Sequence, residues 1–290
     1  MELLIEQFFN GLVAGAMYAL ITLGLTLVYG VMKILHVAHA SVYTVGAYIG
    51  LSLYTATGSL LLALLGSMIF CAALGVCIEK FVYYPLLKFP AYVSLISSIA
   101  ILIGVEETCR LVAGPEVRSF PAAIPFPALR LGTLTVSPVI TMTFVVTVVI
   151  LALLWFIMTR TELGLAMRAV SQDMEIASAM GVNTQRTVAI TFVIGSAIAA
   201  VAGILTGIYY NQVYPMMGTV PAYKTLALIV VGGMGSASGA VLASLLLGIA
   251  ETLLIGFANI PLPRDALAFI AMIIILMWRP TGLMGKRGGK

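Results

Sequence analysis

The sequence predicts an all-α polytopic membrane protein with about nine transmembrane helices, eight being the alternative number. Of its 290 residues, 61% are hydrophobic and only 9% are charged, whereas soluble domains carry roughly 25% charged residues. The apolar residues form continuous runs and do not alternate as in a membrane β-strand, so the spans are expected to be helices. We expect a single transmembrane domain over residues 1–290.

The expected spans follow one another as separate apolar runs. They cover residues 8–30, 42–56, 60–78, 93–113, 138–159, 188–210, 226–231, 240–257 and 266–278. The second and seventh runs adjoin breaks, VMKILHVAHAS and GGMGSASG, so some helices are expected to be discontinuous. The acidic start, with Glu2 and Glu6, is unlike a secretory signal, so the first run is read as a retained span.

Two connections have a pattern of their own. Residues 79–90 are expected to form a short polar loop with two lysines. The stretch LRLGTLTVS at residues 129–137 alternates in polarity around a glycine, which predicts a small hairpin on the membrane surface.

The distribution of Lys and Arg predicts the orientation, because short cytoplasmic loops are enriched in basic residues. Placing residues 160–186 inside the cell also places Lys33, Lys80, Lys88 and the basic tail inside. The N-terminus is then outside and the C-terminus cytoplasmic.

Signatures of catalysis are missing from the sequence. No G-x-x-x-x-G-K-[ST] loop, His-Glu-x-x-His motif or serine elbow can be written. The three cysteines and two histidines lack metal-ligand spacing, so we expect no metal site and no bound cofactor. The chain is therefore not expected to be an enzyme or to bind ATP itself, and nothing in it indicates nucleic-acid binding.

Polar residues inside apolar runs are candidates for the path of a transported solute. The break near residue 36 resembles the discontinuous helices that build transporter sites from glycines and polar side chains. Glu251 lies alone in the middle of a span, where it either makes a structural hydrogen bond or lines the path. Glu106, Glu107 and Arg110 form either a polar vestibule or a neutralised helix end. The candidate path residues are Asn10, Tyr18, His39, Ser41, Tyr43 and Glu251.

The longest polar interval runs from Arg160 to Arg186 and predicts helix, turn, helix. Small residues follow Glu175, and Gly181 with Asn183 closes the second helix. A short helix with a flat face and charged ends suits a groove on a partner protein. The alternative is an ordinary amphipathic cytoplasmic loop.

The motif E-x-A-x-x-x-G at Glu175, Ala177 and Gly181 resembles the coupling motif of ABC importer permeases. RAVSQDMEIASAMGVN is similar to the version in branched-chain amino acid permeases. NGLVAGAMYALITLGLTLVYGVM, AHASVYTVGAY, GPEVRSFP, GGMGSASGAVLASLLLGIAE and RPTGLMG resemble segments of that family in the same order, over nearly the whole chain. Where the family often has Asn, Gly and an acid, this chain has His36, Ala40 and Ser41.

The resemblance implies a permease subunit in a bacterial inner membrane, importing branched-chain or other hydrophobic amino acids. It implies three kinds of partner: a second permease subunit, two ATPase subunits that hydrolyse ATP with Mg²⁺, and a periplasmic binding protein. The two permease subunits are expected to be different chains rather than two copies of one chain. Residues 160–186 would be the coupling loop. The coupling residues it implies are Arg168, Glu175, Ala177, Gly181 and Asn183.

Two alternatives stay open. Relatives of the same family import urea, short amides or aromatic acids, so the substrate can differ. An ion-coupled secondary transporter, with Glu251 as the coupling acid, is the competing mechanism.

Overall fold

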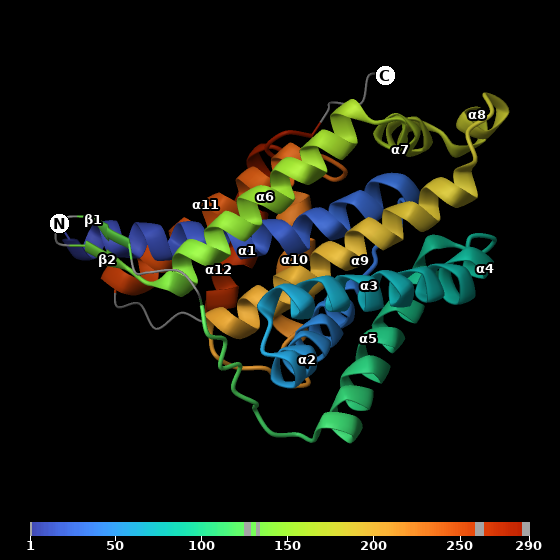
Figure 1. Cartoon of the computed structure of the whole chain (residues 1–290). Helices are drawn as coiled ribbons and strands as arrows, with labels where there is room; N and C mark the ends of the chain where they lie inside the picture. The colour runs from blue at the N-terminus through green and yellow to red at the C-terminus, as the bar shows by residue number, and fades with distance from the viewer. Residues whose placement is uncertain (1, 125–128, 132–133, 259–263, 286–290) are drawn as a thin grey trace.

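A computed structural model describes residues 2–124, 129–131, 134–258 and 264–285, and it is helical apart from one small hairpin (Figure 1). In chain order its elements are α1 (Glu2–Met32), α2 (His39–Thr57), α3 (Leu60–Ile78), the π-helical turn η1 (Glu79–Tyr83), α4 (Tyr84–Leu86), α5 (Ala91–Ala113), β1 (Leu129–Leu131), β2 (Leu134–Val136), α6 (Pro138–Arg160), α7 (Glu162–Gln172), α8 (Met174–Ala179), α9 (Thr184–Tyr209), α10 (Thr219–Gly232), α11 (Ala237–Ala258) and α12 (Arg264–Trp278).

Five helical stretches are long and apolar enough to cross a membrane. They are Leu4–Met32, Leu60–Leu86, Pro138–Arg160, Thr184–Tyr209 and Ala237–Gly256. The expectation of an all-helical, multi-pass membrane protein is therefore confirmed. The number of passes and the orientation stay predictions.

The centre of the molecule is α1, which is packed between α9 and α11 (Figure 1). The contact with α11 is a backbone-to-backbone approach at glycines. A Cβ atom added at Gly248 would lie 2.3 Å from the backbone nitrogen of Gly15 and 2.6 Å from the carbonyl oxygen of Gly11. The spacing of Gly11 and Gly15 on one helix face allows this approach, since neither carries a side chain.

The expectation of a loop over residues 79–90 is wrong for most of that range. The chain continues from α3 through η1 and α4 as a helix and leaves it only after Leu86. The π-helical turn shifts the helix register at Tyr83, whose hydroxyl reaches two buried polar partners, His36 and Ser98. Those side-chain bonds join parts of the chain far apart in sequence, so no local pattern revealed them.

Two further boundaries differ from expectation. The first helix spans Glu2–Met32 rather than residues 8–30, and α10 begins at Thr219 rather than at residue 226. Pro221 lies in the first turn of α10, where proline is tolerated because the backbone N–H has no helical partner there.

The break between α1 and α2 and the hairpin are both present. Lys33 has a φ of 57°, and residues 33–38 leave the helical path before α2 begins. Strands β1 and β2 pair antiparallel, with Leu129 opposite Val136. The hairpin and α8 lie at opposite ends of the molecule in Figure 1.

Candidate functional site

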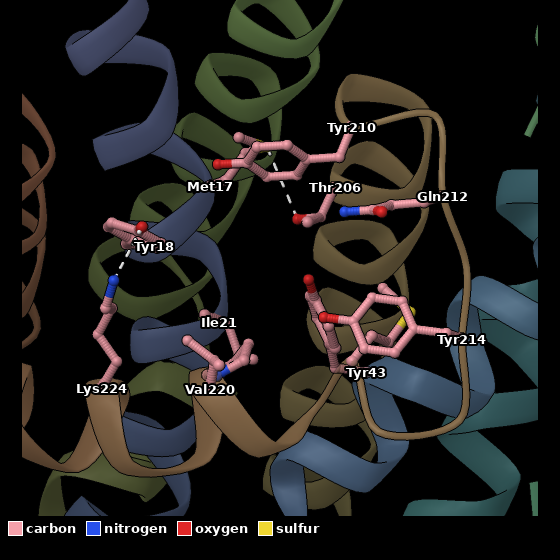
Figure 2. A pocket seen from close by; sticks show the side chains of 12 residues that line it. Met17, Tyr18, Ile21, Tyr43, Thr206, Tyr210, Gln212, Tyr214, Val220 and Lys224 are labelled. Carbon is pink, nitrogen blue, oxygen red and sulfur yellow. Dashed lines mark hydrogen bonds between the residues drawn. The ribbon is translucent and has the colours of Figure 1, made fainter. Parts of the chain in front are cut away.

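A cavity of about 230 Å³ lies where α1, α2, α9 and α10 meet the connection after α9. Figure 2 shows its side chains. It is lined by Met17, Tyr18, Ile21, Tyr43, Thr206, Tyr210, Gln212, Tyr214, Met217, Val220, Pro221 and Lys224. Aromatic and aliphatic side chains with a few polar groups are typical of small-molecule sites.

One wall of the cavity holds a buried ion pair. The Lys224 ammonium on α10 lies 2.8 Å from a carboxylate oxygen of Glu251 on α11, and both side chains are at most 5% exposed. Tyr18 of α1 connects the two, because its hydroxyl donates to Glu251 at 3.0 Å and accepts from Lys224 at 3.1 Å. Charges buried in this way persist when each is paired and hydrogen-bonded.

The opposite wall is aromatic and comes from α2 and the connection after α9. In Figure 2, Tyr43, Tyr210 and Tyr214 lie across the cavity from Tyr18 and Lys224, with Gln212 beside them. An extended segment holds this connection in place, since the backbones of Arg118 and Val213 form a β-bridge with N–O distances of 2.8 Å.

The structure brings only part of the predicted path together. Tyr18 and Tyr43 line the cavity, and Glu251 contacts it through Lys224 and Tyr18. His39 and Ser41 are buried in helix packing near the start of α2 and are not among the lining residues. Asn10 is half-buried on α1 and does not line the cavity either.

The sequence-based selection missed Lys224 and the lining side chains of Gln212, Tyr210 and Tyr214. Lys224 lies just before residues 226–231, the expected seventh span, and its charge interrupts the apolar run there. The signal that could have found it is a basic residue inside TVPAYKTLALIVVG, a stretch otherwise without charges.

The acids of α5 take separate roles. Arg110 and Glu107 form an exposed pair at 3.4 Å, one turn apart. Glu106 is buried and accepts a hydrogen bond of 2.8 Å from the Thr219 hydroxyl, at the start of α10. The local pair fits the neutralised helix end, while Glu106 joins α5 to the helix that carries Lys224.

A polar network occupies the break between α1 and α2. The Tyr83 hydroxyl lies 2.7 Å from Nδ1 of His36 and donates to Oγ of Ser98 at 2.8 Å. The same Ser98 oxygen accepts from the backbone N–H of Ala38 at 2.8 Å, directly before α2. The network therefore connects η1 to the start of the helix that carries Tyr43.

The polar interval forms two short helices, each with its own cap. The Thr161 hydroxyl caps α7 by accepting from the backbone N–H of Gly164. Asp173 caps α8 by accepting from two backbone N–H groups at 2.9 Å each, and Asn183 caps α9 in the same way at 2.9 Å. These side chains are preferred N-caps because they satisfy free amide groups of the first turn.

The residues of the predicted coupling motif lie on both faces of α8. Ala177 is buried against the rest of the chain, while Glu175 is exposed together with Ile176 and Met180. Gly181 ends α8 with a φ of +88°, a conformation that favours glycine. Among the other predicted coupling residues, Asn183 caps α9, and Arg168 is exposed on α7 with its guanidinium on the carbonyl oxygen of Met158.

A second cleft, of about 490 Å³, lies between α8 with the start of α9 and the η1–α4 segment. Its lining includes Ser178, Gly181 and Asn183 on one side and Glu79 and Tyr84 on the other. Glu79 is 3% exposed, and in the part of the chain that the structure describes its carboxylate makes no hydrogen bond to another residue. A carboxylate that lines a cleft can accept hydrogen bonds from a basic side chain that enters it.

A profile of the permease component of the branched-chain amino acid transport system matches residues 7–277. The high-affinity branched-chain amino acid transport system permease protein LivH of Escherichia coli (strain K12) is 34% identical over 302 residues, covering 97% of this chain and 96% of the relative. The permease protein BraD of Pseudomonas aeruginosa is 33% identical over 295 residues, with the same coverage.

A different permease of the same kind of system also matches over part of the chain. LivM of Escherichia coli (strain K12) is 30% identical over 126 residues, covering 43% of this chain and 29% of LivM. Since the family profile and the LivH and BraD relatives span nearly the whole sequence, the chain belongs to the family of permease components of branched-chain amino acid transport systems.

Proposed function

We propose that the chain is the membrane permease subunit of an ABC importer that carries branched-chain or similar hydrophobic amino acids across the bacterial inner membrane. As a member of its family it is a transport subunit and not the ATPase. The observation that carries the proposal is the cavity beside Tyr18, Tyr43 and Lys224, in a chain that aligns end to end with amino-acid permeases.

The lining of the cavity favours this substrate over urea and short amides. Met17, Ile21 and Val220 offer an aliphatic surface for a branched side chain. Lys224 offers a cation for a carboxylate, which urea and short amides lack. Its ion pair with Glu251 also argues against Glu251 as the coupling acid of an ion-driven carrier, because that acid already has a buried partner 2.8 Å away.

The proposed partners are a second permease subunit, two ATPase subunits and a periplasmic binding protein. The partial match to LivM supports a mixed permease pair, since LivH and LivM are both permease proteins of a high-affinity branched-chain amino acid system. ATP and Mg²⁺ would be used by the ATPase subunits alone.

We place α7 and α8 on the cytoplasmic side and the N-terminus outside. The enrichment of basic residues in cytoplasmic loops supports this orientation. The arrangement of the elements also agrees with it, because α4, α7 and α8 gather at one end in Figure 1 and the hairpin lies at the other.

The ATPase would dock on α8 and on the cleft beside it. The exposed side chains of Ile176 and Met180 provide apolar contact, and Glu79 provides a buried acceptor for a lysine or arginine of the ATPase. A movement of η1 could be transmitted to the cavity through hydrogen bonds. Tyr83 of η1 bonds to the segment directly before α2, and α2 carries Tyr43, which lines the cavity.

Glu79→Gln is expected to weaken ATPase binding, because the substitution removes the charge and keeps the shape. The loss should be about 30-fold or more, or about 2 kcal/mol, the lower end for breaking one side of a buried charge pair. Titration of the purified permease pair with its ATPase measures it. Glu107→Gln, at the exposed pair on α5, is the matched control. Equal affinity for Glu79→Gln and the wild type would show that the acid takes no part in docking.

Val220→Trp tests the proposed function at the cavity itself. The indole would occupy much of a space of about 230 Å³, so leucine uptake by the complete transporter should fall at least about tenfold, equal to about 1.4 kcal/mol. Val149→Trp places the same side chain on an exposed face of α6 and should leave uptake near the wild-type rate. Unchanged uptake by the Val220 variant would remove this cavity from the path.

A further inference from the structure

We propose that the cavity binds its amino acid as an oriented zwitterion, with the carboxylate at Lys224 and the ammonium against the aromatic wall. The inference rests on the proposed function and adds the direction in which the substrate lies. Its basis is the difference in chemistry between the two facing walls in Figure 2.

The carboxylate end is a preorganised cation. Glu251 and the Tyr18 hydroxyl hold the Lys224 ammonium at 2.8 and 3.1 Å, and the ammonium lies 4.7 Å from the centre of the Tyr18 ring. A flexible lysine normally loses side-chain entropy when it binds an anion, and here the packing has already fixed it. A substrate carboxylate can join the pair by accepting from the Lys224 ammonium, while the single Tyr18 O–H stays on Glu251.

The ion pair also explains how a lone lysine can be kept in a membrane helix. Lys224 is 2% exposed, and a buried charge without a counter-charge carries a large desolvation cost. Glu251, 2.8 Å away, supplies the counter-charge, and the pair adds no net charge to the cavity wall. In this arrangement Glu251 positions the cation, while Lys224 contacts the substrate.

The ammonium end is the aromatic wall. Tyr43, Tyr210 and Tyr214 come from two different segments and lie on the same side of the cavity, with the Gln212 amide among them (Figure 2). In Figure 2 the hydroxyl ends of Tyr210 and Tyr214 point toward the cavity, and phenol oxygens can accept hydrogen bonds from the ammonium N–H groups. An amide oxygen adds an acceptor for the ammonium N–H groups. This wall carries no acidic side chain, so it would hold the ammonium weakly and allow release.

The space between the two ends is apolar. Met17, Ile21 and Val220 line it, and their side chains fit a short branched aliphatic group. An amino acid that spans the cavity would therefore contact the cation, the aromatic wall and the apolar middle at the same time. A solute without a carboxylate would leave the cation of Lys224 without a new partner and gain less on binding.

The test uses the complete transporter, reconstituted in proteoliposomes with its binding protein, and measures ATP-driven leucine uptake. Lys224→Met combined with Glu251→Leu replaces both charges by apolar groups of similar size, a change that buried ion pairs often tolerate. We expect the double variant to assemble into the complex while leucine uptake falls at least about tenfold, as for a lost charge-assisted hydrogen bond.

Two further variants distinguish recognition of the substrate carboxylate by Lys224 from a purely structural role of the ion pair. Lys224→Arg keeps a cation at the position and should retain much of the uptake. Lys224→Glu combined with Glu251→Lys restores an ion pair with the charges exchanged, and its uptake should stay low because an anion now faces the cavity. Full uptake by either the exchanged pair or the apolar pair would overturn the proposed orientation. A wild-type transporter that moves urea and no amino acid would instead overturn the proposed function.

Discussion

Replacing Gly181 with proline should abolish ATP-driven uptake while the subunit still inserts into the membrane. Gly181 has a φ of +88°, and its backbone N–H donates to the carbonyl oxygen of Ser178 at 3.0 Å. Proline fixes φ near −65° and has no N–H, so the turn that ends α8 cannot form. The exposed side of α8, where the ATPase is proposed to dock, would then no longer be held in a fixed orientation relative to α9. Uptake and ATP hydrolysis, measured together in the assembled complex, should become uncoupled or the complex should not assemble.

The matched control is Gly58→Pro. Gly58 also has a positive φ, +68°, and also ends a helix with its N–H on a backbone carbonyl, at the other end of α2 from the break. The Gly58→Pro substitution should destabilise its helix end to a similar degree while leaving the surface of α8 unchanged. Glu175→Arg is a second probe, since it reverses an exposed charge at the start of α8. Normal transport in both the Gly181 and Glu175 variants would refute the assignment of α8 to ATPase docking.

Replacing Gly248 with valine should prevent the folded subunit from accumulating. Its first side-chain carbon would lie 2.3 Å from a backbone atom of Gly15, and no rotamer change moves a backbone. Overpacking costs about 1–3 kcal/mol or more where the neighbours cannot adjust, a large part of a marginal stability. The amount of protein that elutes as a single species after detergent extraction measures this effect.

Gly104→Val on α5 is the control, because a Cβ there meets nothing within 4 Å. It should accumulate at the wild-type level. If the Gly248 variant accumulated equally well, α1 and α11 could separate at little cost, and their contact would not be the centre of the fold.

Much of the helical architecture could be predicted because lipid imposes simple constraints. A run of apolar residues long enough to span must be helical, and each of the long runs in this chain forms a helix. The hairpin of β1 and β2 was predictable from its alternation, and the two short helices after Arg160 from their capping residues. These are local signals, carried by neighbouring residues.

The features that could not be predicted depend on contacts distant in sequence. Tyr18 and Glu251 are 233 positions apart, and their hydrogen bond is set by the packing of α1 on α11. The π-helical turn at Glu79 is stabilised by the partners of Tyr83, which lie in other helices. Lys224 could not be predicted as a site residue from local hydropathy, because a charged residue lowers it. The partner of Lys224 on α11, Glu251, makes the lysine compatible with a membrane helix.

The central claim, that this subunit is driven by ATP hydrolysis in partner subunits, is tested most directly by changing the energy source. The chain is reconstituted in proteoliposomes with its second permease subunit and binding protein, with and without the ATPase subunits. Leucine uptake should require both the ATPase subunits and internal ATP, and should continue when ionophores remove the ion gradients. Uptake that proceeds without nucleotide and stops when the gradients are removed would contradict the account.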